Sequence, residues 1–181
     1  MTRRIAIYGG SFDPFHLGHL VPTVRAQETF RFEAVYFVPA GSPPHKDAGP
    51  LTAVTHRLAM VAMATLPYDN FFTSDDEVFA PQPTYSVETV HRFRDRFPDA
   101  TLYFILGSDS FSQIATWDRW EELVDSVHLV VLHRAHMWAD ELAKKVPERL
   151  LERMQEVEVF AEVPDPGGLT VYLLNHEPFP I

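Results

Sequence analysis

Short apolar runs alternate along this chain with longer segments in which apolar residues recur at helical spacing. The runs expected to form strands are residues 5–8, 33–38, 101–106, 127–132 and 169–174. The segments with helical spacing are 19–30, 51–61, 87–97 and 120–124. Strands that alternate with helices are typical of a sheet covered on both faces. The expected fold is therefore α/β, a Rossmann-like, doubly wound parallel sheet that binds ligands at the carboxyl ends of its strands.

Three further segments carry specific expectations. In residues 51–61, alanine and methionine fill most positions between the spaced apolar residues, which predicts a helix buried on more than one side. Residues 71–79 are strand-like but polar in the middle. A helix is expected at 108–115, directly after the strand at 101–106.

The composition is that of an ordinary globular domain. The length of 181 residues fits one domain, expected to span 1–181, and 46% hydrophobic with 22% charged residues excludes intrinsic disorder. The longest apolar run, near residues 58–64, is far shorter than the roughly 18 residues that span a bilayer, so no membrane partner is expected. The absence of cysteine excludes disulfides, thiolate metal sites and cysteine nucleophiles, and it fits a cytoplasmic protein.

The net charge of the chain limits the kinds of molecule that it is expected to bind. With 25 acidic and 15 basic side chains, the net charge is −10, which repels a polyanion and argues against nucleic acid as a partner. A ligand that carries phosphate must therefore meet a local basic cluster. The sequence leaves a homo-oligomer open.

Residues 9–19 are the most informative segment, with the sequence Gly-Gly-Ser-Phe-Asp-Pro-Phe-His-Leu-Gly-His. Two glycines at a strand end let the backbone approach a ligand closely. His16 and His19 stand at the start of a helix, where unpaired N–H groups favour an anion. Residues three apart share a helix face, so both imidazoles can face one phosphate, and Gly18 keeps that face uncrowded. Surface histidines at a helix cap and a zinc site are the alternatives; the pairing disfavours the first, and the lack of a nearby third ligand disfavours the second.

This segment resembles the signature of the nucleotidyltransferase superfamily, whose (His/Thr)-x-Gly-His motif binds the phosphates of a nucleoside triphosphate. Within the superfamily, the chain is similar to the bacterial nicotinate mononucleotide adenylyltransferases. The similarity extends from about Arg4 to Arg134. Its later pieces are Pro43-Pro-His-Lys46, His56-Arg57, Pro83-Thr-Tyr-Ser86, Phe104-Ile-Leu-Gly-Ser-Asp109 and Thr116-Trp117.

The resemblance implies adenylyl transfer from ATP to nicotinate mononucleotide, giving nicotinate adenine dinucleotide and pyrophosphate in NAD biosynthesis. The implied catalytic residues are His16 and His19. The implied ATP-binding residues are Gly9, Gly10, Ser11, Phe12, Gly18, Gly107, Ser108, Asp109 and Arg134. The implied residues for the mononucleotide are Asp13, His45, Lys46, Tyr85, Ser86 and Trp117. Mg²⁺ is expected to arrive with ATP, without a fixed protein metal site.

Several of these residues can also be interpreted from local physical chemistry. Trp117 could stack on a pyridine ring, and the alternative is that it packs in the core. For Trp120 and Trp138, a position in the core is the expectation. Tyr85 and Ser86 begin a helix, so a hydroxyl and unpaired N–H groups suit the nicotinate carboxylate; many family members have threonine in place of Ser86. Asp109 suits a ribose hydroxyl, and Ser108 or Asp109 is also a candidate helix N-cap.

The local basic cluster that the net charge requires consists of His16, His19, His45, Lys46, Arg57, His133 and Arg134. For Arg57, which lies in a predicted helix, pairing with an internal carboxylate is the alternative.

One departure from the family concerns the C-terminus. The family usually continues with a motif in which hydroxyl residues precede an arginine that holds ATP phosphates, and this sequence stops at Ile181, where that motif would begin. We therefore expect the C-terminal end to be incomplete. The competing functions are those of phosphopantetheine adenylyltransferases, which usually have threonine in place of His16, of cytidylyltransferases, and of a nucleotide-binding sensor without turnover.

Overall fold

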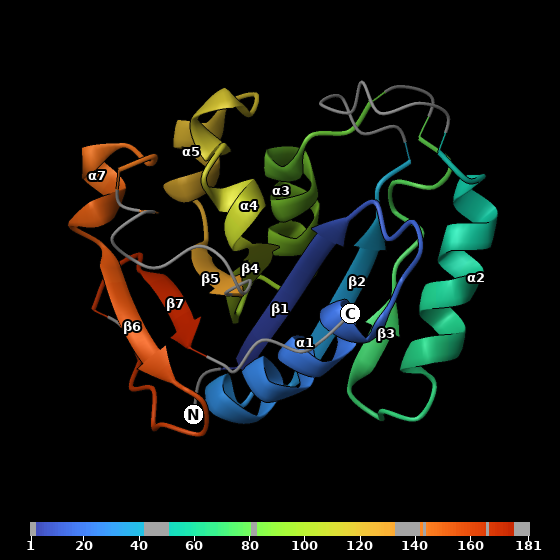
Figure 1. The fold of residues 1–181 in the computed structure, drawn as a ribbon, viewed down its shortest axis with the longest axis horizontal. Helices are drawn as coiled ribbons and strands as arrows, with labels where there is room; N and C mark the ends of the chain where they lie inside the picture. Colours follow the sequence, from blue (N-terminus) through green and yellow to red (C-terminus); the bar gives the residue numbers. More distant parts are fainter. Residues whose placement is uncertain are drawn as a thin grey trace.

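A single parallel sheet forms the centre of the protein. The computed structural model describes residues 3–41, 51–80, 83–132, 142, 144–165 and 167–175. Seven strands lie in the order β3-β2-β1-β4-β5-β7-β6, and every neighbouring pair is parallel (Figure 1). The strands are β1 (Arg3–Gly10), β2 (Ala34–Pro39), β3 (Phe71–Thr73), β4 (Ala100–Gly107), β5 (His128–Leu132), β6 (Met154–Glu158) and β7 (Val171–Asn175). The predicted fold class is confirmed.

Helices cover both faces of this sheet (Figure 1). One face carries α1 (Leu17–Phe30) and α2 (Val54–Thr65). The opposite face carries α3 (Ser86–Arg96), α4 (Ser108–Phe111), α5 (Trp120–Val124) and α7 (Glu148–Leu151), with a 3-10 turn, η1 (Ile114–Thr116), after α4. Among the described helices, none is long and apolar enough to cross a membrane.

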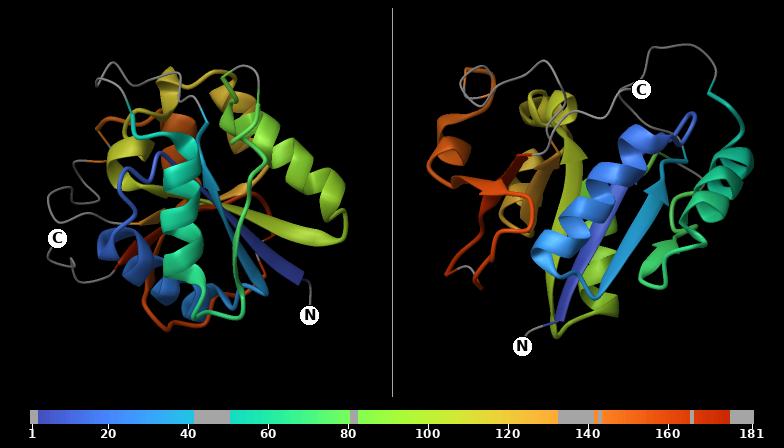
Figure 2. Two further views of the ribbon diagram at one scale, coloured as in Figure 1. Left: turned by 90° about the vertical axis from the view of Figure 1, so that its right-hand side faces the viewer. Right: turned by 60° about the horizontal axis from the view of Figure 1, so that its bottom comes forward.

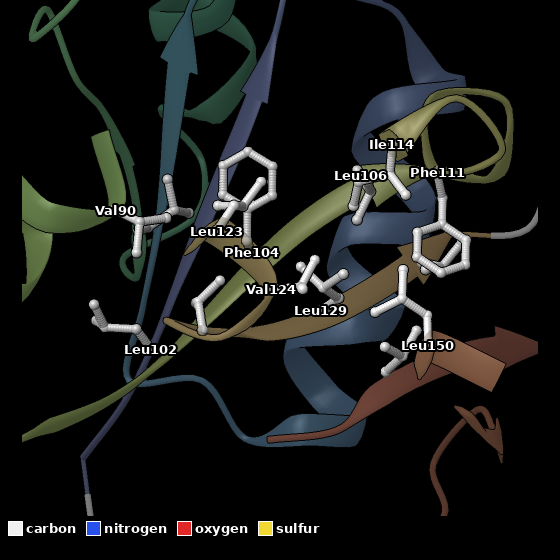
Figure 3. Close-up of a cluster of buried hydrophobic side chains, with 14 of the residues drawn as sticks. Val90, Leu102, Phe104, Leu106, Phe111, Ile114, Leu123, Val124, Leu129 and Leu150 are labelled. Carbon is white, nitrogen blue, oxygen red and sulfur yellow. The ribbon is translucent and has the colours of Figure 1, made fainter. Parts of the chain in front are cut away.

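The core consists of two apolar layers, one on each side of the sheet. Successive side chains of β4 alternate between them, because strand side chains point to opposite faces. Phe104 and Leu106 enter the layer under α3 and α5, which Figure 3 shows, while Tyr103 and Ile105 enter the layer under α1. The central strands are therefore buried on both faces and form a rigid support for the loops at their ends.

The order of the strands creates a place for a ligand. β2 lies on one side of β1 and β4 on the other, so the chain leaves β1 toward one face of the sheet and leaves β4 toward the other. In such sheets the crevice outside the carboxyl ends of these two strands is the usual binding site. The carboxyl end of β1 was expected at Tyr8, but the strand continues through Gly9 and Gly10, which pair with Val38 and Pro39 of β2.

The predicted burial of α2 on more than one side is wrong. Only Arg57, Val61 and Thr65 of this helix are buried, whereas Met63 is 77% and Leu66 84% exposed. The physical reason is position: α2 packs on the β3 edge of the sheet, where no other helix or strand of the described residues covers its outer side (Figure 2). An abundance of alanine and methionine does not distinguish this position from a central one.

Two other expectations need correction, and two elements had no expectation. The strand expected over 71–79 is only Phe71–Thr73, because Ser74 turns the chain and its hydroxyl oxygen accepts the backbone N–H of Asp76 at 3.2 Å. The helix expected over 108–115 is divided into α4 and η1. The edge strand β6 and the short helix α7 were not predicted.

Candidate active site

A pocket of about 540 Å³ lies at the carboxyl ends of β1 and β4. It brings together most of the predicted site residues: Gly9, Gly10, Ser11, Phe12, Asp13, His16, His19, Tyr85, Ser86, Gly107, Asp109 and Trp117. Gly18 and Ser108 do not line it. His45, Lys46, His133 and Arg134 lie outside the described residues, as does Trp138.

The two motif histidines are held at the start of α1 by their own backbone. His16 is the N-cap of α1, and its Nδ1 accepts the backbone N–H of Gly18 at 3.1 Å. Nδ1 of His19 accepts the backbone N–H of His16 at 3.4 Å, and the two rings lie 4.0 Å apart. A neutral imidazole whose Nδ1 accepts a hydrogen bond carries its proton on Nε2. In the neutral form of each ring the proton is then on Nε2; both histidines line the pocket, and Gly18 donates its N–H to His16.

Aromatic side chains fix the His19 ring. Phe15 stacks on it at a centroid distance of 5.5 Å, and Phe12 meets it edge-on at 5.3 Å. Phe12 is only 2% exposed and has a φ of 47°, in the left-handed region that non-glycine residues rarely adopt. Such backbone strain persists only where the surroundings enforce it, and it is concentrated at functional sites.

The glycines at the end of β1 make room for these aromatic side chains. A Cβ on Gly10 would lie 3.0 Å from the Phe12 ring, and a Cβ on Gly9 would lie 3.1 Å from the Phe104 ring. Both glycines also line the pocket. Their small size thus has a packing role that the sequence interpretation, based on ligand approach alone, did not include.

The first turn of α3 forms another part of the pocket wall. The helix begins at Ser86 with Tyr85 as its N-cap, as predicted, and both residues line the pocket. The first N–H groups of a helix have no acceptor within the helix. A hydroxyl, backbone N–H groups and the positive end of the helix dipole therefore meet at this wall, an arrangement that suits a carboxylate.

Trp117 stands at the rim between this wall and the end of β4. It is half-buried, lines the pocket and meets Phe104 nearly perpendicularly, with 6.4 Å between ring centroids. Both Trp117 and Trp120 pack against the same core layer, and the Arg149 guanidinium lies 5.7 Å from the Trp120 ring centroid. The difference between them is that Trp117 lines the pocket and Trp120 does not, so the predicted division of roles stays a prediction.

At the end of β4, the predicted cap is wrong. Gly107 is the N-cap of α4, and Ser108 is already its first helical residue, 1% exposed. Asp109 is exposed and lines the pocket. Ser108 is thus buried in the turn, while Asp109 stands at the pocket surface, where its predicted role toward a ribose stays a prediction.

Comparisons with known proteins agree with this geometry. The sequence model described as cytidylyltransferase-like matches residues 7–165. The chain belongs to the cytidylyltransferase-like family. Two of its relatives are named probable nicotinate-nucleotide adenylyltransferases. The one from Desulfatibacillum aliphaticivorans is 42% identical over 131 residues, 72% of this chain and 60% of the relative. The one from Aeromonas hydrophila is 37% identical over 155 residues, 86% of this chain and 71% of the relative.

Solved structures share the same fold. The nicotinic acid mononucleotide adenylyltransferase of Plasmodium falciparum, complexed with NaAD, has a TM-score of 0.71 and 22% identity. The match covers 98% of this chain and 77% of that one. These findings confirm the resemblance drawn from residues 9–19 and the later motifs. The match to the Desulfatibacillum relative spans only 60% of that protein's length.

The position of Arg57 in this family member differs from the prediction. Arg57 was placed in the basic cluster around the phosphates, with an internal carboxylate as the alternative partner. Instead its side chain is 1% exposed, does not line the pocket and donates to backbone carbonyl oxygens of Ser11, Ala40 and Thr52. Arg57 therefore holds together the segments that form the site and is not part of the pocket surface.

Among the described residues, the charges at the pocket are mainly negative. The lining contains the carboxyl groups of Asp13, Glu77, Asp109 and Asp118, the two imidazoles, and no lysine or arginine. No three His, Cys, Asp or Glu side chains of the described part are grouped as they would be around a metal ion. Within this part of the site, the candidate donors to a phosphate are the two imidazoles, side-chain hydroxyls such as those of Ser11 and Ser110, and backbone N–H groups.

Sequence reasoning missed Glu77 and Thr84 in the pocket wall. Glu77 is 7% exposed and accepts a hydrogen bond from the Thr89 hydroxyl of α3 at 2.5 Å. Burial raises the pKa of its carboxyl group, against the opposing effects of the Thr89 hydrogen bond and of the Arg92 charge. In the sequence, Glu77 follows two aspartates and so resembles part of a solvated acidic turn. No local pattern indicates its burial.

Proposed function

We propose that this protein transfers the adenylyl group of ATP to nicotinate mononucleotide, forming nicotinate adenine dinucleotide and pyrophosphate, a step in NAD biosynthesis. The observation that carries the proposal is the His16–His19 pair, with rings 4.0 Å apart, in the pocket at the carboxyl end of β1. The names of the relatives support the choice of substrate. Solved P. falciparum structures of similar fold, complexed with APC and with NaAD, support a nucleotide site in this architecture.

The reaction needs no general base. An anionic phosphate oxygen of the mononucleotide attacks the α-phosphorus of ATP, and the bond from that phosphorus to the pyrophosphate oxygen breaks. The nucleophile is already ionised, so catalysis consists of alignment and of stabilising charge on the transferring and leaving groups. His16 and His19 donate from Nε2 to those oxygens. The nucleotide is the Mg²⁺ complex of ATP, and the ion enters with it as part of the substrate.

The two substrates occupy different walls of the pocket. The ATP wall consists of Gly9, Gly10, Ser11, Phe12, Gly107 and Asp109, with Gly18 and Ser108 behind it. The mononucleotide wall consists of Asp13, Tyr85, Ser86 and Trp117. Arg134, as a further contact of the triphosphate, and His45 and Lys46, as further contacts of the mononucleotide, lie outside the described residues and are proposed from the sequence motifs alone. In this arrangement the first turn of α3 receives the nicotinate carboxylate and Trp117 stacks on the pyridine ring.

We also propose that residues 1–181 form one domain and that the protein works on small molecules in the cytoplasm. A net charge of −10 disfavours nucleic acid as a partner. The complete absence of cysteine is typical of a reducing compartment.

A substrate panel tests the proposed activity. Pyrophosphate release is measured with ATP or CTP and with nicotinate mononucleotide, its amide, or phosphopantetheine as acceptor. We expect the highest kcat/KM with ATP and nicotinate mononucleotide. A preference for phosphopantetheine or CTP would replace this function with that of another superfamily member. ATP binding by calorimetry without pyrophosphate release from any acceptor would support the nucleotide-binding sensor.

Ser86→Ala tests the placement of the carboxylate. Loss of the hydroxyl should lower kcat/KM for nicotinate mononucleotide by about tenfold or more, since a hydrogen bond to a charged group is worth roughly 1.5–3 kcal/mol. The amide substrate should be affected much less. Ser86→Thr is the matched control because it keeps the hydroxyl and should keep the preference. An equal loss for the acid and the amide contradicts this placement.

A further inference from the structure

Arg57 is a buried cation with an unusual set of partners. Its Nε donates to the Thr52 carbonyl at 2.9 Å, one Nη to the Ser11 carbonyl at 2.6 Å, and the other Nη to the Ala40 carbonyl at 2.7 Å. The side chain is 1% exposed. Burial lowers the pKa of the guanidinium, and the Asp13 carboxylate opposes that shift. An arginine side chain stays charged in proteins, so a full positive charge is fixed behind the pocket wall.

These acceptors, with the Gly41 carbonyl at 3.4 Å as a fourth, belong to three segments that are distant in sequence. Ser11 follows β1, Ala40 follows β2, and Thr52 precedes α2, so one guanidinium connects the ends of two strands to the start of a helix. Asp13 adds a further connection, because its Oδ2 accepts the backbone N–H of Thr52 at 2.8 Å. Ser11, Asp13 and Ala40 all line the pocket, whereas Arg57 does not.

Arg4 provides a comparison within the same protein. It too donates to backbone carbonyls, those of Phe30 and Val163 at 3.1 Å, and its side chain is 13% exposed. It also forms an ion pair with Asp165. Arg4 lies near the start of β1, and none of its hydrogen-bond partners lines the pocket. Both arginines join distant segments, but only Arg57 joins segments that form the pocket.

We infer that Arg57 is a positioning residue for adenylyl transfer: its guanidinium fixes the Ser11–Asp13 segment, and through it the His16 cap, where the phosphates are received. The inference rests on the proposed function. The segment from Ser11 to His16 includes Phe12 at a φ of 47°, a conformation that its surroundings must enforce. A guanidinium can hold three carbonyls at once because its donors form a rigid fork, which a lysine ammonium does not reproduce.

The kinetic test compares Arg57→Lys and Arg57→Met with Arg4→Lys and Arg4→Met in the full chain. For each variant, kcat and both KM values are measured with ATP and nicotinate mononucleotide, together with the midpoint of thermal unfolding. We expect Arg57→Lys to lower kcat roughly tenfold to a hundredfold, the effect of a misplaced reacting geometry. Arg4→Lys should lose thermal stability and retain kcat within about twofold. Arg57→Lys keeps the positive charge, so it still provides the test if Arg57→Met does not fold.

A second measurement does not require turnover. Nitrogen NMR of ¹⁵N-histidine-labelled protein reports the state of Nδ1 and Nε2 in each ring. We expect Arg57→Lys to shift the His16 signals and Arg4→Lys to leave them in place. If Arg57→Lys keeps both the wild-type kcat and the His16 signals while the unfolding midpoint falls, Arg57 has only a structural role and the inference is overturned. If the wild-type protein does not turn over these substrates, the proposed function fails, and the histidine signals alone still decide the role of Arg57.

Discussion

The two ends of the parallel sheet use the same residue types in opposite ways. At the carboxyl end, His16 and His19 fix Nδ1 on the backbone and line a pocket. At the amino end, His128 is 7% exposed, accepts the backbone N–H of Thr170 on Nδ1 at 3.1 Å and stacks on Tyr103 at 5.0 Å. The imidazoles at one end are available to a ligand, and the imidazole at the other is enclosed.

The environment of the amino end explains this difference. Burial lowers the pKa of His128 to about 4, with the Arg153 and Arg4 charges acting in the same direction. Burial also raises the pKa of Tyr103 to about 12. Both side chains are therefore neutral at pH 7. At the carboxyl end, by contrast, helix starts and loops leave donors facing the pocket. Position along the strand, and not residue type, thus separates groups that are enclosed in the fold from groups that line the pocket.

The largest expected effect comes from His19→Ala. Removing one donor to the reacting phosphates should lower kcat about 10²- to 10³-fold. The midpoint of thermal unfolding should change by only a few degrees, since the ring lies at the pocket surface. His128→Asn is the matched control, because its amide oxygen can still accept the Thr170 N–H. Its kcat should stay within about twofold of wild type. If the two variants have comparable kcat values, the histidines at the carboxyl end of the sheet have no special role in turnover.

The next effect is the dependence of the free energy of unfolding on acidic pH. The pKa of His128 is about 4 in the folded protein and 6.5 when unperturbed, so the unfolded state binds more protons between these values. The free energy of unfolding should therefore fall as the pH is lowered from 6.5 to 4, with His128 contributing about 2 kcal/mol of the loss. Denaturant titrations at a series of pH values measure this fall. In His128→Asn the slope should be smaller, and an unchanged slope would assign the acid sensitivity to other groups.

The smallest of these effects distinguishes the two tryptophans. Trp117→Ala should raise the KM for nicotinate mononucleotide about tenfold, the loss expected when an aromatic stacking partner is removed. The KM for ATP should change little. Trp120→Ala should lower the unfolding midpoint and leave both KM values near wild type. If Trp117→Ala affects only stability, Trp117 is a core residue like Trp120.

Much of the central fold could be predicted because its signals are local. The apolar run at 101–106 and the periodic spacing at 87–97 indicate β4 and α3 without knowledge of their neighbours. The edge strand β6 gives no such signal, since three of its five residues are polar or charged and it pairs only with β7. The exposure of α2 was also beyond local reasoning, because it depends on where the helix lies on the sheet.

The same distinction holds for the site. The motif from Gly9 to His19 is continuous, so its spacing alone predicted that both imidazoles meet at a helix start. Arg57 is different: its acceptors at Ser11 and Ala40 are 46 and 17 positions away in the chain. Glu77 accepts a hydrogen bond from Thr89, which is 12 positions later in the chain and lies in α3. Contacts of this kind arise from the tertiary fold, and a sequence pattern within one segment does not contain them.

The most direct test of the central claim is a crystal structure with a non-hydrolysable ATP analogue and nicotinate mononucleotide. We expect α-phosphate oxygens within about 3.2 Å of Nε2 of His16 or His19, the separation of an N–H···O hydrogen bond. We also expect the nicotinate carboxylate at the first turn of α3. Nucleotide bound elsewhere, with both imidazoles facing only solvent, would contradict the account.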